Sequence, residues 1–133
     1  MDNKDIFIID FFGPWTGPKP FAFRITTSNI VVSNRNISLV NLSIEDTLYE
    51  GDENSLPCKI HSIKKIPEEY CPLNNIIYPV YILNNGEDEE GEISVDHQGY
   101  ITISTDTNHG TFDPGNRSYG IRKTTISWSR IFT

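Results

Sequence analysis

Residues 76–83 constrain the fold of this chain more than any other segment. They read IIYPVYIL and are apolar at nearly every position. Successive side chains of a strand point to opposite faces, so both faces of this segment are apolar. Strands of a two-sheet sandwich normally alternate apolar and polar residues. We therefore expect a central strand that has a second burying surface, such as a symmetry-related copy of the chain.

A second apolar run lies at 6–12, between an acidic start and Gly13-Pro14. Such a run is typical of a strand buried on both faces, or of one buried against a neighbouring chain. The stretch 13–20 cannot continue a ladder, because proline lacks the N–H and glycine favours turns. We interpret 1–20 as an N-terminal strand and Gly/Pro connector that forms an inter-chain or docking arm, and 21–133 as a β-sandwich head domain.

The other strand signals are short and separated by turn residues. A slip in the apolar phase at Val40-Asn41 predicts a β-bulge, and Asp96-His97-Gln98-Gly99 has the composition of a hairpin connection. In the last strand, Ile126 and Trp128 are expected to point inward. Further strands are expected at 21–25, 30–32, 37–44, 59–63, 92–96, 100–104 and 124–132.

Three polar stretches are expected to be loops. The first, 45–57, is acidic, with one helical turn expected between Ile44 and Tyr49; the third is 105–120. The second, 84–90, contains four consecutive acids, which we interpret as a solvated loop because they lack the alternating spacing of a Ca²⁺ loop. About eight or nine short strands with such turns predict an all-β fold, an antiparallel β-sandwich of the jelly-roll kind.

Composition narrows the class of protein. A length of 133 residues suits one domain, and a formal net charge of −7 without clustered Lys and Arg argues against nucleic acid as a partner. Cys58 and Cys71 leave two possibilities open, a single disulfide or two free thiols. No basic and apolar leader opens the chain, and no apolar segment has the roughly 20 residues that span a bilayer. We expect a protein made in a cytoplasm and not secreted by its own signal, with no membrane insertion.

No recognisable catalytic group stands out. His61, His97 and His109 lie in different segments without the spacing of a zinc site, and nucleophile-elbow, phosphate-loop and Cys-His motifs are absent from the sequence. A carboxylate pair for glycoside hydrolysis stays open, since its separation is a property of the fold. We expect neither an enzyme nor a metal or other cofactor.

The loop 105–120 is the strongest candidate for a ligand-binding surface. It mixes groups that hydrogen-bond with groups that stack on sugars, and loops on a rigid sandwich commonly carry binding. Two alternatives stay open for its aromatics, because Phe112 and Tyr119 suit packing against the core equally well. Two roles also stay open for Trp15, which could form a platform for a ligand or pack between chains. The candidate ligand-binding residues are Trp15, Asp106, Asn108, His109, Asp113, Arg117 and Tyr119.

The order of motifs in the C-terminal half resembles the β-sandwich head domains of bacteriophage tail fibres, receptor-binding proteins and baseplate proteins. In those heads a Pro-x-x-Tyr-x-Pro turn precedes a Pro-Val strand, a Gly-x-Ile hairpin follows, and an Ile-Ser-Tyr or Ile-Ser-Trp strand closes the sheet. The matching positions are Pro67, Tyr70 and Pro72, then Pro79-Val80, then 91–95 with 99–103, and finally Ile126-Ser127-Trp128.

The resemblance implies a virion structural protein that mediates host-surface attachment or particle assembly as a homotrimer. Its partners would be a larger virion protein, bound through the N-terminal strand, and a host-surface glycan or protein. Only about 65 residues precede the matching segment, too few for the shaft of a fibre, which favours a structural or decoration role. A stand-alone carbohydrate-binding module and a capsid decoration protein with no receptor role are the alternatives.

Overall fold

Ten antiparallel strands form one curved sheet in the computed structural model, which describes residues 3–132 and all their side chains except those of 3–5, 108 and 132. Two single-turn 3₁₀ helices lie between strands, η1 at Glu68–Tyr70 and η2 at Asn108–Gly110. The strands are β1 Asn3–Phe12, β2 Lys19–Val32, β3 Arg35–Ile44, β4 Thr47–Glu50, β5 Ile60–Ser62, β6 Ile76–Asn84, β7 Glu87–Val95, β8 Ile101–Thr105, β9 Ser118–Ile121 and β10 Thr124–Phe132.

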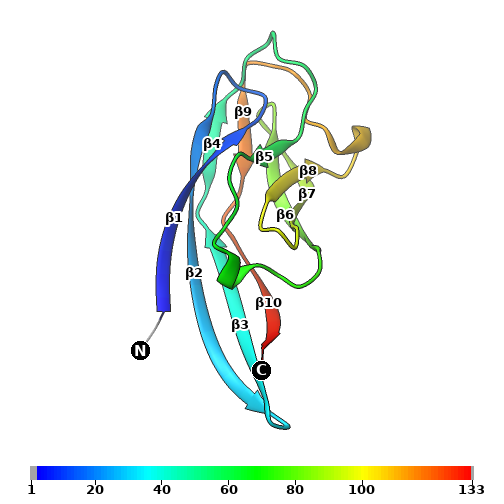
Figure 1. Cartoon of the computed structure of the whole chain (residues 1–133). Coiled ribbons are helices and arrows are strands. Elements are labelled where there is room, and N and C mark those ends of the chain that lie inside the picture. The colour runs from blue at the N-terminus through cyan, green and yellow to red at the C-terminus, as the bar shows by residue number, and fades with distance from the viewer. Residues whose placement is uncertain (1–2, 133) are drawn as a thin grey trace.

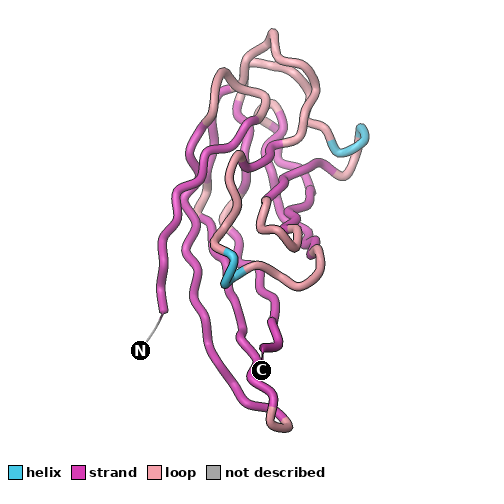
Figure 2. The backbone as a smooth tube through the Cα atoms, in the orientation of Figure 1, coloured by secondary structure: helices cyan, strands magenta, loops and turns pink. Residues whose placement is uncertain are grey.

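The sheet curls because two pairs of strands turn the same corner. Its order is β10-β3-β2-β1-β5-β8-β7-β6-β9-β4. β3 runs into β4 after two residues, and β9 runs into β10 after two residues, so both members of an antiparallel pair bend together at 45–46 and 122–123. The two halves of the sheet therefore face each other as a half-barrel (Figure 1 and Figure 2). This confirms the all-β antiparallel class.

β1 lies inside this sheet. It pairs with β2 from Asn3↔Thr27 to Phe11↔Lys19, and its last two residues also pair with β5. Trp15 follows in the connector, where its indole Nε1 donates to the Phe11 carbonyl at 3.3 Å. The division of the chain at residue 20 stays a prediction, since pairing within one copy does not exclude a partner on the exposed face of β1.

The core fills the space between the two halves of the sheet. Its members alternate along the strands, as period two requires; Ile126 and Trp128 point inward as predicted. One end of the core is aromatic: the rings of Phe11 and Phe21 lie 4.5 Å apart, and Trp15 meets Tyr49 edge-on at 5.4 Å. Aromatic pairs in such geometries contribute roughly 0.5–1.5 kcal/mol beyond the area that they bury.

Tight turns fix the registers of the hairpins. Ser33 and Asn34 connect β2 to β3 with φ of 49° and 66°, and Asn85 and Gly86 connect β6 to β7 with φ of 51° and 84°. Two consecutive positive φ values give the turn whose twist matches the flanking strands. In the predicted hairpin between β7 and β8, the Asp96 carboxylate accepts from the backbone N–H groups of residues 98–100.

Several local expectations were wrong. The four acids Glu87–Glu90 belong to β7, because the turn before them needs only Asn85-Gly86. β3 keeps one register with both neighbours from 36 to 44, so there is no bulge at Val40-Asn41. The stretch 45–57 contains β4 in place of a helical turn, and 105–120 contains most of β9, which brings the strands to ten.

Both cysteines are free thiols, so the second of the two possibilities left open is correct and the single disulfide is not formed. Cys71 is buried and Cys58 is half-buried, and burial raises the pKa of each thiol. No helix in the described part of the chain is long and apolar enough to cross a membrane.

Candidate functional site

The predicted ligand-binding loop is held to the molecule by its two aromatic residues. Phe112 and Tyr119 are fully buried, with their rings edge-on at 6.2 Å. The Tyr119 hydroxyl donates to the carbonyl of Asp113, and burial raises the pKa of that hydroxyl, with the Asp113 carboxylate adding to the shift. Tyr119 thus anchors the loop, and its ring has no exposed face on which a sugar can stack.

The remaining loop residues divide into two places. Asp106 and His109 are exposed beside η2, at the end of β8, and the side chain of Asn108 lies outside the described residues. Asp113 and Arg117 lie near the β6–β7 turn instead. The backbone N–H of Asp113 donates to the Asn84 amide oxygen at 3.1 Å, and that of Arg117 donates to the Asn85 amide oxygen at 3.2 Å.

Trp15 is 5% exposed and packs inside its own chain against Phe21 and Tyr49. Of the two interpretations left open, packing is therefore correct and a ligand platform is not. The ring packs in the core of one copy and not at a contact between chains. The seven candidate residues do not form one site. Two are in the core, three lie in or beside η2, and two lie near the β6–β7 turn.

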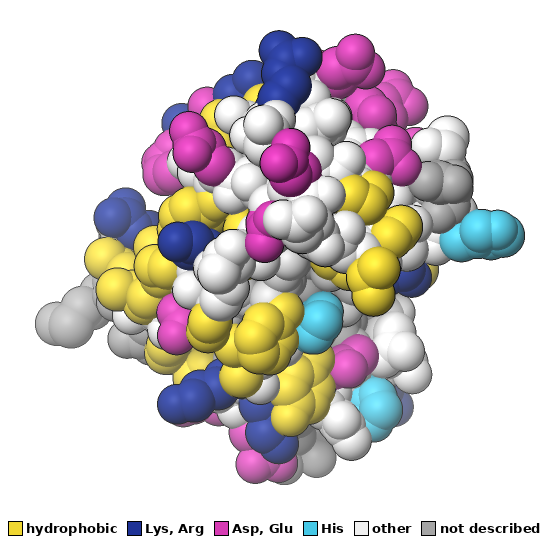
Figure 3. Space-filling model, turned by 90° about the horizontal axis from the view of Figure 1, so that it is seen from above, with side chains coloured by type: hydrophobic (Ala, Val, Ile, Leu, Met, Phe, Trp, Pro, Cys, Tyr) yellow, Lys and Arg dark blue, Asp and Glu magenta, His cyan; other side chains and the backbone are white. Residues whose placement is uncertain are grey.

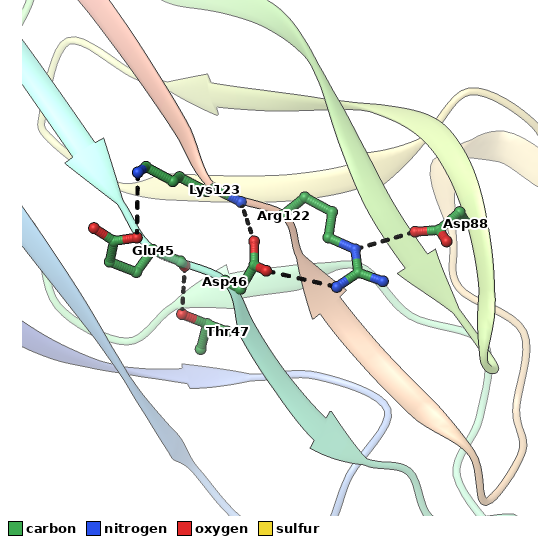
Figure 4. A network of polar contacts seen from close by, with 6 residues as sticks. All are labelled: Glu45, Asp46, Thr47, Asp88, Arg122 and Lys123. Atoms are coloured by element: carbon green, nitrogen blue, oxygen red, sulfur yellow. Dashed lines mark hydrogen bonds and ion pairs between the residues drawn. The ribbon is translucent and has the colours of Figure 1, made fainter.

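The corner of the sheet carries a network of polar contacts, shown in Figure 4. Arg122 lies between two carboxylates, 3.1 Å from Asp88 and 3.7 Å from Asp46. The other oxygen of Asp46 accepts from the backbone N–H of Lys123 at 2.6 Å, and the Arg122 N–H donates to the Tyr81 carbonyl at 2.9 Å. These groups replace ladder bonds where both strands bend, so the network is structural.

No group of three or more His, Cys, Asp or Glu side chains able to hold a metal ion occurs among the described residues. The acids of β7 follow the strand, where Glu90 and Glu92 pair across it with Tyr81 and Pro79 of β6. Asp88, Glu90 and Glu92 lie on the outer face of the sheet, whereas Glu89 lies on the other face and accepts from the Asn84 side-chain amide at 3.3 Å.

Each of the two long apolar runs places some side chains in the core and others on the exposed outer face. In β1, Ile9 and Phe11 are buried, but Ile6 and Ile8 are 64% and 72% exposed. Ile8 pairs with Ala22 of β2, which is also exposed, so the outer side chains are neighbours across the ladder. We call Ile6, Ile8, Phe12 and Ala22 the β1 patch.

β6 repeats the pattern on the other half of the sheet. Val80 and Ile82 are buried, whereas Ile77 and Tyr81 are 62% and 63% exposed, with the exposed Pro79 between them. We call Ile77, Pro79 and Tyr81 the β6 patch. The prediction that 76–83 has apolar side chains on both faces is confirmed. Leu83, the next side chain on the outer face, is buried, but the described part of the chain leaves Ile77, Pro79 and Tyr81 exposed.

A third apolar group lies at the tip of the β2–β3 hairpin. Pairing between β1 and β2 stops at Thr27, so the β2–β3 hairpin extends past β1, with β10 beside β3 as far as Asn36 (Figure 1). We call the end of this hairpin, residues 28–35, the arm tip. Every side chain from 28 to 32 is exposed, including Ile30, Val31 and Val32. Figure 3 shows further hydrophobic side chains exposed in groups between acidic and basic ones. Contiguous exposed apolar surface of this kind marks interaction sites.

No family model matches the sequence, and no curated protein is significantly similar to it. The candidate functional site therefore rests on geometry: three apolar groups on the outside of a rigid sheet. Sequence analysis found the runs behind the β1 and β6 patches. It missed the arm tip, although three consecutive β-branched or apolar residues directly before Ser33-Asn34 are a signal of an exposed hairpin end.

Proposed function

We propose that the protein is a structural component of a virus particle, of the kind found in phage fibre and baseplate heads. It binds copies of itself and a larger particle protein through the apolar groups on its outer face. The single observation that carries the proposal is the outer face of β1, where Ile6 and Ile8 are largely exposed beside Ala22. Removing such surface from water contributes roughly 25 cal/mol per Å².

The architecture supports this proposal. A curved sheet with a closed core and tight turns gives a rigid body, and its polar groups at the corner and turns already bond to one another. The facing halves of the sheet give the sandwich-like shape that the resemblance implies, and we assign the jelly-roll-like head type on that basis. A trimer is the assembly that accompanies this head type, and closed rings bury surplus apolar surface.

Between the two roles that the resemblance implies, assembly is better supported than attachment through a glycan-binding loop. Trp15 and Tyr119, the aromatics expected to stack on a sugar, are in the core. Asp106 and Asp113, expected to share one site with them, lie at separate places. We therefore assign the binding energy to protein–protein contacts.

Antibody labelling of virus particles, purified from cells that express this chain, tests the proposed role in the virus particle. We expect label at regular positions on the particle, together with the protein in stoichiometric amount by quantitative mass spectrometry of the particles. Absence of the protein from purified particles, with abundant protein in the same lysate, would contradict the virion role.

A further inference from the structure

One side of β1 lies open along most of its length. β1 pairs with β2 over residues 3–11, whereas β5 pairs only with the last two residues of β1. The Asp10 carbonyl accepts from the Ile63 N–H at 2.9 Å, on the β5 side. Successive residues of a strand direct their N–H and C=O groups alternately to its two sides, so residues 6 and 8, like residue 10, direct theirs away from β2. We call this side, from residue 3 to residue 9, the β1 edge.

The backbone groups of Ile6 and Ile8 are available on this side. Among the described residues, nothing forms a hydrogen bond with the N–H or C=O of either isoleucine. Figure 1 shows this part of β1 at the margin of the molecule, with β2 on one side. A row of alternating main-chain donors and acceptors matches the edge of another strand, which is how extended peptides add to a sheet.

The β1 edge also lacks the features that keep a strand edge from pairing. Natural edges are short, carry charges or proline, or are broken by a bulge. Residues 6–9 have none of these, since they read Ile-Phe-Ile-Ile in one unbroken register with β2. The strands at the two ends of the sheet differ: β4 has four residues, and on β10 the Tyr78 hydroxyl donates to the Ser127 carbonyl. The β1 edge is therefore open to an added strand.

Symmetry and charge indicate where such a strand comes from. Two β1 edges can pair with each other only about a twofold axis, which a ring of three copies lacks. The chain has a formal net charge of −7, and the exposed Asp10 lies where the β1 edge meets β5. All strand pairs in this sheet are antiparallel, so the N-terminal end of an added strand would meet Asp10. A strand with a basic N-terminal end, from a different chain, is complementary to this edge.

We propose that the β1 edge binds an extended segment of the larger particle protein as an added antiparallel strand. The segment is apolar at alternate positions, which lie beside Ile6 and Ile8 on the outer face, and it has a lysine or arginine at its N-terminal end. The inference rests on the proposed function, because it names how the partner of the β1 patch binds. The added strand lies in the plane of the sheet, so the outer face stays available to other copies.

A fluorescent peptide of sequence Lys-Thr-Val-Thr-Val-Thr-Val is the probe, and fluorescence anisotropy measures its binding to the full chain. Its first two valines would lie opposite Ile8 and Ile6, with the lysine beside Asp10. We expect saturable binding, which is lost when those two valines are N-methylated, because they can then no longer donate to β1. A peptide with glutamate in place of the lysine is expected to bind more weakly.

One variant tests the backbone of β1 itself, with a matched control. Ile8→Pro removes an open N–H and keeps the side chain apolar, and proline is tolerated on an edge where the N–H faces solvent. Ser129→Pro makes the same removal on β10, where the Ser127 carbonyl two residues earlier also faces away from β3. We expect Ile8→Pro to weaken peptide binding about tenfold or more and Ser129→Pro to leave it unchanged. Far-ultraviolet circular dichroism checks that both variants fold.

Hydrogen exchange of the wild type gives a second measurement that needs no substitution. We expect the peptide to slow the exchange of the amide protons of Ile6 and Ile8. The amide of Ile9 already pairs with β2, so its exchange should not change. Unchanged exchange at Ile6 and Ile8 in the presence of bound peptide would contradict strand addition, whether or not Ile8→Pro folds.

Other outcomes overturn the inference. Binding that survives both N-methylation and Ile8→Pro would place the peptide on an apolar face, and absence of any binding would show that the β1 edge does not accept a strand. Loss of wild-type self-assembly in Ile8→Pro would make a second copy the occupant. The virion role is decided separately by particle labelling, which can succeed or fail independently of peptide binding.

Discussion

Two neighbouring isoleucines of β1 differ in burial, so the same substitution at each position measures how much burial contributes to stability. Ile8 is 72% exposed and Ile9 is 6% exposed, yet both lie in the same strand and pair with β2. Replacing either by alanine costs the same strand propensity. The difference between Ile8→Ala and Ile9→Ala therefore reports which face the fold itself encloses.

The expected magnitude follows from the core. Removing a buried isoleucine side chain costs about 2–5 kcal/mol, since the cavity closes only in part. An exposed position costs about 0.5 kcal/mol or less apart from strand propensity. We expect Ile9→Ala to lower the free energy of unfolding by about 3 kcal/mol relative to Ile8→Ala, a change of roughly a hundredfold in the unfolding equilibrium.

Urea unfolding followed by tryptophan fluorescence measures this difference. With a slope of about 2 kcal/mol per M, the midpoint of Ile9→Ala should fall about 1.5 M below that of Ile8→Ala. Each curve is recorded at two protein concentrations, because assembly makes apparent stability depend on concentration. Equal losses for the two variants at a concentration where both are monomeric would refute the assignment of an open outer face to β1.

Three further predictions concern the glycine of β9, the corner of the sheet and two buried titratable groups. Gly120→Ala should cost more than about 3 kcal/mol or prevent folding, because Gly120 has φ of 154° and a Cβ there would lie 1.9 Å from the Thr47 carbonyl oxygen; soluble, wild-type-like Gly120→Ala would contradict the packing of β9 on β4. Arg122→Gln should lower the free energy of unfolding by about 1 kcal/mol or less, since its ion pairs are exposed. A larger loss in urea unfolding would contradict this small contribution. Burial raises the pKa of the Cys71 thiol and the Tyr119 hydroxyl, so the neutral forms stabilise the fold fully below the unfolded values of about 8.5 and 10. That stability is lost as the pH rises through the pKa values of the folded state. Unfolding midpoints measured from neutral to alkaline pH should therefore fall, and midpoints that do not change with pH would refute the prediction.

Much of the fold could be predicted from the sequence, because burial alternates with period two through most of β3 and the first part of β2. The alternation in 21–25 and the inward Trp128 came directly from side-chain spacing, and the structure confirms both. The acids of β7 misled the analysis, since charge indicates exposure and an outer strand face is as exposed as a loop. The two-residue turn at Asn85-Gly86 was the stronger local signal there.

The candidate binding residues could not be placed from sequence because their positions depend on pairing across the chain. Tyr119 reaches the core only because β9 joins β4 and β6, which lie far away in sequence. Trp15 is buried because a connector of fixed shape returns its ring onto Phe21.

The central claim is that the outer apolar groups are covered by other copies of the chain. Light scattering coupled to size exclusion, across a range of micromolar concentrations, tests it most directly. A particle of three times 15.1 kDa is the predicted result. A constant mass of 15.1 kDa at every concentration would contradict it.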